Sequence, residues 1–290
     1  MQYKFKLSGE SLSLASAELK ALFDIFDLDF KITKTENNFA NVKTRATPDL
    51  ITKLCERSAF IKRAYDGDSI IWEVSKGRFL EREPQRKPAF HPTTLKPKLA
   101  RALINLSRAG EGNVLLDPFC GAGSVLIEAG ILGINTIGSD FDDEMIVRAK
   151  KNLIFYKIKK HKTLIGDATG LEGILEKESV DAIATDLPYG RSSRASTKDL
   201  SKLYEKFLSS AYFVLKKNKY LAFLYPNYWN RIGLKPSTSV RLQFKNSRAA
   251  NFCYVDATKI YNKKIWKIIS KAELYVHGSL TRKLLVLQKR

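Results

Sequence analysis

Four consecutive residues, Asp186-Leu187-Pro188-Tyr189, combine hydrogen-bond acceptors with an aromatic face. The Asp186 carboxylate and the Leu187 main-chain carbonyl could both accept hydrogens from an amino group attached to an aromatic ring. Such an amine is a poor nucleophile because its lone pair is delocalised, so a site that modifies it must position the nitrogen and raise its electron density. Tyr189 offers a ring on which a flat base could stack, and Pro188 stiffens the loop. The motif therefore predicts group transfer to an exocyclic amine.

A glycine-containing turn lies upstream, in the stretch DPFCGAGS at 117–124. Glycines let the backbone approach a ligand closely, and the expected helix after them offers free N–H groups. A dinucleotide-binding turn would read G-x-G-x-x-G, but Leu126 occupies the place of the third glycine. Asp117 would repel a pyrophosphate, whereas it would attract the ammonium end of S-adenosylmethionine. The turn therefore favours a methyl donor.

Two later strand ends carry acidic residues that suit the rest of such a donor. Asp140 follows the glycine turn by about 20 residues, a spacing at which a carboxylate can hydrogen-bond ribose hydroxyls. Phe141 could lie against the adenine ring, and Asp142 is expected to cap the next helix. Asp167 has two interpretations, an acceptor for the adenine amino group or a cap.

The charge balance predicts a polyanionic partner. The 290 residues include 50 Lys and Arg against 30 Asp and Glu, a formal net charge of +20. Nucleic acid is the favoured partner of so basic a chain. An anionic membrane surface is a weaker alternative, because the chain shows no concentrated basic amphipathic helix. A surface rich in lysine without a specific partner is the third interpretation.

Neither a membrane span nor a secretion signal is expected, because the chain lacks the long apolar runs that both require. Cys55, Cys120 and Cys253 are far apart and odd in number, which argues against a disulfide framework and fits a reducing cytoplasm. No metal is expected, because His161 and His277 have no third ligand at suitable spacing.

Residues 1–80 are expected to form a small α+β domain. Its expected elements are strands at 3–7, 39–43, 61–65 and 70–74 and helices at 13–26 and 48–57. The inferred order, strand-helix-strand-strand-helix-strand, indicates a ferredoxin-like domain. Residues 81–97 are a basic connector broken by prolines, which marks the expected domain boundary.

Residues 98–290 alternate between helical and strand patterns, which predicts an α/β domain with a doubly wound, mostly parallel sheet. The last two strand candidates, 272–277 and 283–288, are separated by a turn at Gly278 and indicate an antiparallel hairpin. A seven-stranded Rossmann-like sheet closed by such a hairpin is typical of class I methyltransferases.

Four stretches together resemble one family, the archaeal tRNA guanosine-10 N2-methyltransferases. They are PAFHP at 88–92, DPFCG at 117–121, TDLPYGRSS at 185–193 and HGSLTR at 277–282. The resemblance implies methylation of the guanosine N2 amine in tRNA, once or twice, with S-adenosylmethionine as donor. It also implies that the segment from His91 to Leu95 helps to close over the donor. Guanine N2 in ribosomal RNA, adenine N6 in DNA and a non-catalytic RNA-binding role are the alternatives.

The chain departs from this family in two ways. Leu187 stands where many relatives have proline, but only its carbonyl is required, so activity should be retained. The family usually carries a THUMP RNA-binding domain, for which the 1–80 region leaves no room beside a ferredoxin-like domain. RNA is then expected to bind the basic connector and the catalytic face, or to be held through a partner. The resemblance implies one candidate for that partner, a small zinc-binding activator protein that some relatives use.

The expected site residues fall into three groups. The catalytic motif is Asp186, Leu187, Pro188 and Tyr189. The methyl donor is expected at His91, Thr94, Leu95, Asp117, Phe119, Cys120, Gly121, Gly123, Ser124, Asp140, Phe141, Asp167, Ala168 and Asp186. RNA phosphates are expected at Lys76, Arg78, Arg86, Lys87, Arg191 and Arg194, for which a solvated surface is the alternative.

Overall fold

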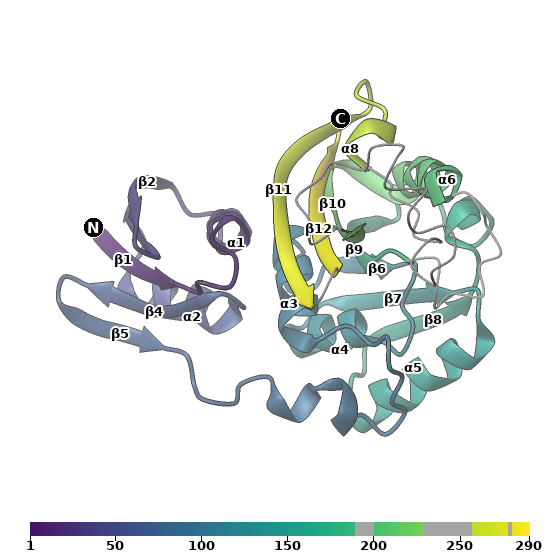
Figure 1. Ribbon diagram of the computed structural model, residues 1–290, viewed down its shortest axis with the longest axis horizontal. Coiled ribbons are helices and arrows are strands. Elements are labelled where there is room, and N and C mark those ends of the chain that lie inside the picture. Colours follow the sequence, from purple (N-terminus) through teal and green to yellow (C-terminus); the bar gives the residue numbers. More distant parts are fainter. Residues whose placement is uncertain (189–199, 229–256, 278–279) are drawn as a thin grey trace, which may run out of the picture.

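The computed structural model describes residues 1–188, 200–228, 257–277 and 280–290, which form two packed α/β units (Figure 1). In the smaller unit, two helices cover one face of a five-stranded antiparallel sheet with strand order β2-β3-β1-β4-β5. Its elements are β1 (Gln2–Leu7), α1 (Leu12–Ile25), β2 (Phe30–Glu36), β3 (Phe39–Thr44), α2 (Pro48–Arg57), β4 (Ile61–Asp66) and β5 (Ser69–Glu73).

The first four strands have the ferredoxin-like order that the sequence predicts, with β5 added at one edge. Strand β1 shows the cause, since Tyr3, Phe5 and Leu7 are buried under the helices while the intervening residues face outward. The sequence-based assignment missed β2. This edge strand is mostly exposed, and its apolar alternation is limited to Phe30 and Ile32, which is too short to identify it.

The larger unit is built on a seven-stranded sheet with the order β11-β12-β10-β9-β6-β7-β8. The five strands from β10 to β8 are parallel, and β12 pairs antiparallel with both β10 and β11. The Rossmann-like sheet and its closing hairpin are thereby confirmed. The strands are β6 (Val114–Asp117), β7 (Asn135–Asp140), β8 (His161–Ile165), β9 (Val180–Asp186), β10 (Leu215–Tyr228), β11 (Trp266–His277) and β12 (Leu280–Lys289).

Helices cover both faces of this sheet (Figure 1). Those on one face are α3 (Pro97–Leu106), α4 (Ser124–Ile131) and α5 (Asp143–Phe155). Those on the other are the 3-10 helix η3 (Ala168–Gly173), α6 (Leu200–Val214) and α8 (Ala257–Ile260). Within the described residues, no helix is long and apolar enough to cross a membrane.

The connector between the units packs on helices α4 and α5 of the larger unit. It contains two 3-10 turns, Leu80–Arg82 and Pro84–Arg86. Arg82 pairs with the buried Glu128 of α4, and Asn152 of α5 exchanges two hydrogen bonds with the backbone of Ala89. These contacts fix the path of the chain toward the site.

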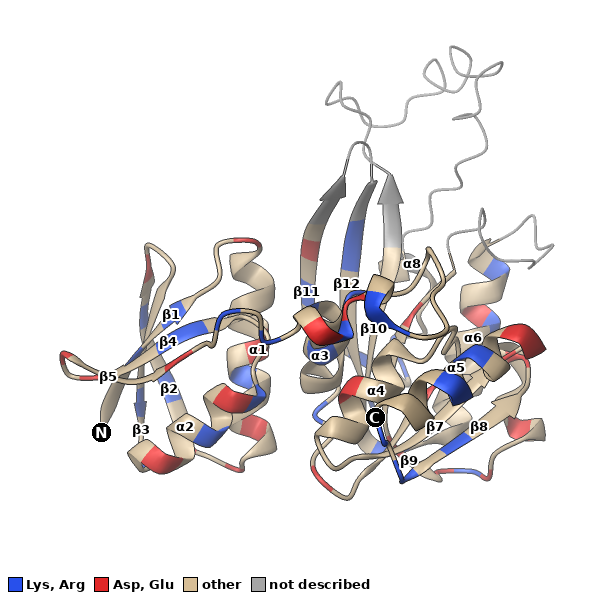
Figure 2. Cartoon of the chain, turned by 90° about the horizontal axis from the view of Figure 1, so that it is seen from below, with Lys and Arg blue, Asp and Glu red and all other residues tan. Residues whose placement is uncertain are grey.

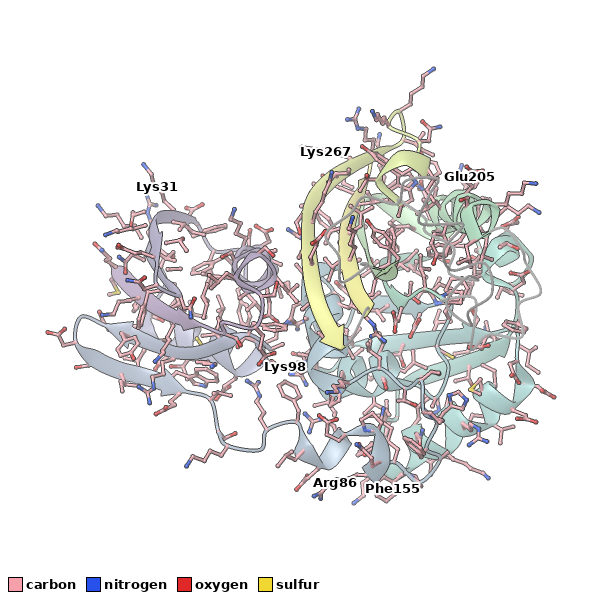
Figure 3. All side chains as sticks on the ribbon, viewed as in Figure 1. Lys31, Arg86, Lys98, Phe155, Glu205 and Lys267 are labelled. Carbon is pink, nitrogen blue, oxygen red and sulfur yellow. The ribbon has the colours of Figure 1, made fainter. Side chains whose placement is uncertain are left out.

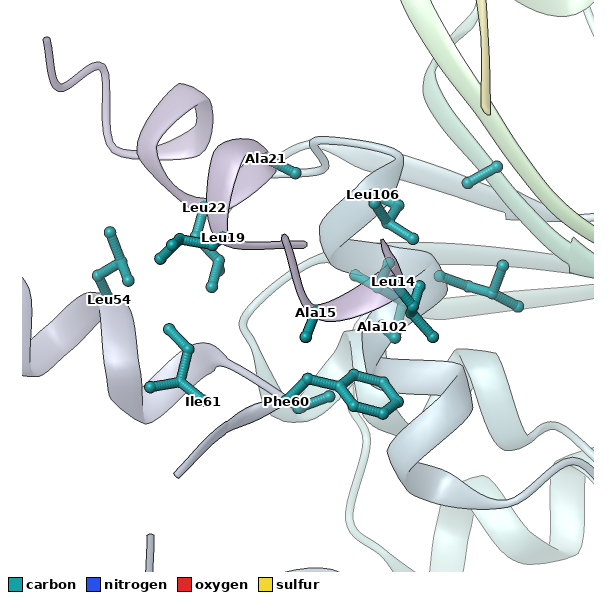
Figure 4. Close-up of a cluster of buried hydrophobic side chains, with 14 of the residues drawn as sticks. Leu14, Ala15, Leu19, Ala21, Leu22, Leu54, Phe60, Ile61, Ala102 and Leu106 are labelled. Atoms are coloured by element: carbon teal, nitrogen blue, oxygen red, sulfur yellow. The ribbon is translucent and has the colours of Figure 1, made fainter. Parts of the chain in front are cut away.

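The two units share an apolar core where α1 crosses α3. Leu14 and Ala15 of α1 are fully buried and gather with Ala102 and Leu106 of α3 (Figure 4). Burial of a leucine side chain of this kind is worth roughly 1.5–3 kcal/mol. The contact therefore holds the small unit in one place on the large one.

Candidate active site

A cavity of about 560 Å³ opens at the carboxyl ends of β6, β7, β8 and β9, where parallel α/β sheets bind ligands. The residues expected to contact a methyl donor line this cavity, with the exception of Gly123. They are His91, Thr94, Leu95, Asp117, Phe119, Cys120, Gly121, Ser124, Asp140, Phe141, Asp167, Ala168 and Asp186. The fold thus brings together side chains from several separate segments.

The cavity is acidic although the whole chain is strongly basic. Its acidic lining residues are Asp117, Asp140, Asp142, Glu144, Asp167 and Asp186. Among the described residues that line it, none is a lysine or arginine. Such a surface suits a ligand with positive charge and would repel a pyrophosphate. The sulfonium and ammonium groups of S-adenosylmethionine fit this condition, whereas a dinucleotide does not.

The glycine turn has the geometry of a close backbone approach. Gly121 and Gly123 have φ angles of 47° and 85°, in the left-handed region that side chains disfavour. Gly123 caps α4 and lies beneath the cavity lining, where an added Cβ would be 3.4 Å from Ala149. The Gly121 N–H donates to Asp140 Oδ2 at 2.9 Å, which ties the turn to the next strand end.

The absent third glycine of the turn has a counterpart on the neighbouring strand. Leu126 is fully buried in α4, and a Cβ on Gly138 of β7 would lie only 2.4 Å from its Cδ1 atom. In dinucleotide-binding folds a glycine on the helix permits close packing of helix and strand. Here the strand carries the glycine and the helix carries the large side chain.

Asp117 is the buried acid of the site, with 2% of its surface exposed. Its Oδ1 accepts hydrogen bonds from Thr185 Oγ1 at 2.6 Å and from the Phe119 N–H at 3.3 Å. Burial, and to a smaller extent the charges of Asp140 and Asp186, raise the pKa of Asp117 to about 7. A cationic ligand would relieve this unfavourable charge, so the residue is placed to bind one.

The other predicted acids take backbone hydrogen bonds at strand ends. Asp140 accepts from Asp142 N as well as from Gly121, and burial raises its pKa. Asp142 caps α5 through the Glu144 N–H, as the sequence predicts. Asp167 caps η3 through Thr169 and also lines the cavity, so its two interpretations are compatible.

The Asp186 motif ends β9 at the cavity. The Leu187 side chain is buried, and its N–H donates to Leu224 O at 2.9 Å. The Pro188 carbonyl accepts a hydrogen bond from the Tyr204 hydroxyl at 2.9 Å. These bonds hold the backbone of the loop on two sides. Tyr189, the proposed stacking residue, lies outside the described residues.

Arg282 is a site residue to which sequence reasoning assigned no role. Its Nη1 lies 3.4 Å from Asp186 Oδ2, and the two side chains are 13% and 16% exposed. The contact follows from sheet order, since β12 lies two strands from β9 and β10 is between them. The HGSLTR stretch signalled this residue, but only the sheet register shows what it touches.

Lys87 is not where a phosphate contact requires it to be. Only 4% of its surface is exposed, and its ammonium donates to Ser124 Oγ at the start of α4. Burial lowers its pKa to about 8. Ser124 in turn donates to Leu95 O at 2.9 Å. Lys87 therefore holds the connector against the glycine turn at 117–124. The prediction that Lys87 contacts RNA is wrong, because the side chain is buried.

The remaining RNA-contact candidates differ in exposure. Lys76 and Arg86 are exposed, and Arg86 projects from the connector (Figure 3). Arg78 is half-buried, donates to Cys55 O, and its guanidinium carbon lies 5.8 Å from the centre of the Trp72 ring. Arg191 and Arg194 lie outside the described residues.

Several cavity residues were not predicted from the sequence to touch the donor. They are Thr93, Pro118, Ala122, Val125, Asp142, Glu144, Met145, Gly166, Leu187, Pro188 and Leu203. Met145 is one of these residues and lies in the first turn of α5. The first turn of α5 follows the Asp140 strand end directly, and that proximity was the available signal.

Comparison with known protein families and sequences gives a consistent result. Residues 84–230 match UPF0020, the RMKL-like methyltransferase domain. The chain is 39% identical over 155 residues to a tRNA (guanine(10)-N2)-dimethyltransferase of Methanothermobacter thermautotrophicus, covering 53% of this chain and 45% of that protein. It is 35% identical over 197 residues to a probable tRNA (guanine(10)-N2)-dimethyltransferase of Methanothermococcus thermolithotrophicus, covering 66% and 98%. The chain spans about half the length of the first of these relatives.

The fold also matches a solved structure, TrmN from Thermus thermophilus. The TM-score is 0.54 at 18% identity, and the match covers 91% of this chain and 60% of that one. Identity at this level concerns the fold alone. Because 91% of this chain is covered, the shared architecture includes the small N-terminal unit as well as the seven-stranded sheet.

Proposed function

The chain belongs to the family of RMKL-like methyltransferase domains, and on this premise we propose that it methylates the N2 amine of a guanosine in tRNA. The donor is S-adenosylmethionine. The observation that carries the proposal is an acidic cavity that ends at the Asp186 motif, within a chain whose net charge is +20. A cationic donor suits the cavity, and a polyanionic substrate suits the rest of the surface.

The chain's own residues would act by position and charge. The donor supplies an electrophilic methyl group when bound, and Asp117 and Asp140 would hold its polar ends. Asp186 and the Leu187 carbonyl would accept hydrogen bonds from the two N–H groups of the guanine amine, which directs its lone pair toward the methyl group. The Asp186 carboxylate would take the one proton that the nitrogen loses when it gains the methyl group. Arg282 would orient the Asp186 carboxylate through their ion pair. No covalent enzyme nucleophile is needed, and burial keeps the Cys120 thiol neutral by raising its pKa.

The names of these relatives agree on the methylated atom, N2 of guanine, and differ in the position of the guanine and in the RNA. Relatives from Methanothermobacter, Pyrococcus and Methanocaldococcus are named for guanine 10 of tRNA, and one from Methanocaldococcus for guanine 6. A relative from Bos taurus is named for guanine N2 in U6 snRNA. Position 10 is therefore the proposed target, dimethylation is the favoured extent, and N2 of guanine in another RNA is the second candidate. A small zinc-binding activator is a proposed partner, and the cytoplasm is the proposed location.

The proposal is tested by incubating the full chain with labelled S-adenosylmethionine and unmodified total tRNA, followed by nucleoside mapping. Label in N2-methylguanosine or its dimethyl form at position 10 is the expected result. Asp186→Ala should abolish transfer and keep donor binding. Asp181→Ala, at the opposite end of the same strand, is the matched control and should keep transfer. Normal transfer by Asp186→Ala, or label on another base, would contradict the proposal.

A further inference from the structure

The N-terminal sheet has one face covered by α1 and α2 and one face that is open. The alternation of β1 directs Lys4 and Lys6 to the open face, opposite the buried Phe5. The strand register places their neighbours on the same face. Figure 2 shows Lys and Arg positions along the strands of this sheet. This surface, here named the basic sheet face, comprises Lys4, Lys6, Lys31, Lys34, Phe39, Lys43, Arg63 and Tyr65.

Two aromatic rings lie among the lysines of the basic sheet face. Phe39 of β3 and Tyr65 of β4 are half-buried, and their ring centroids are 6.3 Å apart. The Lys4 ammonium lies 5.4 Å from the Phe39 ring centre and 5.1 Å from that of Tyr65. Lys6 lies 5.8 Å from the Phe39 ring. Each ring is therefore in reach of a base, and each base would bring a phosphate to the adjacent ammonium.

Among the described residues, the basic side chains of this face outnumber the acidic ones beside them. The register places Glu36 and Glu73 on the same side of the sheet, where they pair with Lys34 and Arg63. Lys31 and Lys43 lie directly opposite each other on β2 and β3, and both are exposed. Figure 3 shows Lys31 projecting from the small unit. Like charges in cross-strand positions destabilise a sheet. A polyanion bound to this face would remove that repulsion.

We propose that the basic sheet face binds a single-stranded segment of the RNA substrate, with bases on Phe39 and Tyr65 and phosphates on the surrounding lysines. The inference rests on the proposed function for the identity of the RNA. Stacking on these two rings requires unpaired bases, which excludes the interior of a duplex. Because α1 lies between this sheet and the catalytic unit, the bound segment is remote from the methylated base (Figure 1).

The first test measures the affinity of the full chain for a labelled, unmodified tRNA transcript. Phe39→Leu together with Tyr65→Leu keeps apolar bulk and removes both rings. Loss of base stacking should weaken binding by about tenfold or more. Thermal unfolding and S-adenosylmethionine binding should remain unchanged, which excludes a folding defect. Ultraviolet cross-linking of the wild-type complex should place RNA on the peptide that contains Tyr65.

The second test concerns phosphate contacts. The logarithm of the binding constant falls linearly with the logarithm of the salt concentration. Lys4→Gln with Lys43→Gln should make this slope shallower by about 0.7 for each lost phosphate contact, the value for single strands. Lys159→Gln with Lys160→Gln is the control, because these exposed lysines precede β8 at the end of the sheet away from the cavity. The control pair should leave the salt dependence unchanged.

The outcomes separate this inference from the proposed function. If the wild-type chain methylates tRNA and the ring variant binds it normally, the basic sheet face is not its docking site and the function stands. If the ring variant loses tRNA affinity although the wild type methylates no guanosine, the face binds RNA and the function fails. Equal competition by a blunt duplex RNA would overturn single-strand binding. Loss of binding to phosphatidylserine vesicles alone would assign the face to membranes.

Discussion

Asp117→Asn replaces a buried carboxylate of the cavity by a neutral side chain of the same shape. Burial, with a smaller effect from Asp140 and Asp186, raises the pKa of Asp117 to about 7. An aspartate in an unfolded chain titrates near 3.9, so the folded state binds this proton about three pH units more tightly. At about 1.36 kcal/mol per unit, the ionised carboxylate costs the fold up to about 4 kcal/mol above pH 7 in the absence of a ligand.

The direction follows from the raised pKa. In the wild type, the contribution of Asp117 to the free energy of unfolding is fully present below about pH 4 and is lost as the pH rises toward 7. The substituted amide cannot titrate. The free energy of unfolding of Asp117→Asn, measured relative to that of the wild type, should therefore increase as the pH rises across this interval. A constant offset from new amide contacts does not alter the slope. The gain should be smaller with S-adenosylmethionine present, because its positive charge stabilises the ionised acid.

Urea unfolding of both proteins from about pH 4 to about pH 8 measures this difference. Asp181→Asn is the control with the opposite sign. Burial of Asp181 raises its pKa, but hydrogen bonds from Lys216 and from the Val114 N–H outweigh burial and leave the pKa below its ordinary value. Its contribution is present above about pH 4, so the control should run parallel to the wild type in this window. A parallel course for Asp117→Asn would refute the reasoning.

Two further substitutions test the contacts that surround the site. Arg282→Gln should lower the rate of methyl transfer at saturating substrates about tenfold or more while donor affinity holds, because it removes the charged partner of Asp186; Arg282→Lys should recover part of that rate, and full activity of the glutamine variant would rule out the role. Gly138→Ala should cost about 1–3 kcal/mol in a denaturation assay, because its methyl group would lie 2.4 Å from Leu126. Leu126→Ala alone should cost about 2–5 kcal/mol, and the double variant should lose less than the sum of the two single losses. Additive losses would contradict this contact.

Local patterns in the sequence predicted the parts of the site that depend on local structure. Helix α4 directly follows the glycine turn as predicted, because Gly123 in the left-handed conformation caps it. Asp142 caps α5 as expected, since a carboxylate before a helix satisfies free N–H groups. Strand ends place Asp117, Asp140 and Asp186 together, because the carboxyl ends of parallel strands meet at one edge.

Long-range packing set the features that the sequence could not predict. Lysine is a residue type that usually lies at the surface, and only the path of the connector over α4 shows that Lys87 is buried. Arg282 reaches Asp186 through a register across three strands, β12, β10 and β9. Edge strand β2 has too few buried side chains to leave a pattern. In each case a contact between distant segments decides the outcome.

The contact between the two units has a functional consequence that Asn105 can test. Asn105 of α3 is fully buried, and its Nδ2 donates to Glu18 Oε1 at 2.7 Å while its Oδ1 accepts from Arg57 Nε at 3.0 Å. Burial raises the pKa of Glu18 and lowers that of Arg57 to about 10, so both charges depend on their hydrogen bonds. Asn105→Ala should therefore cost about 1–3 kcal/mol for each partner left unsatisfied.

If the N-terminal unit holds RNA at a fixed distance from the cavity, the same variant should also weaken the use of tRNA. The KM for tRNA should rise severalfold, while kcat at saturating tRNA and the affinity for S-adenosylmethionine hold, because the cavity itself is unaltered. Leu14→Ala, which thins the apolar part of the same contact, should act in the same direction. A fall in kcat with unchanged KM would place the defect inside the catalytic unit. It would show that the buried contact stabilises the fold without positioning the substrate.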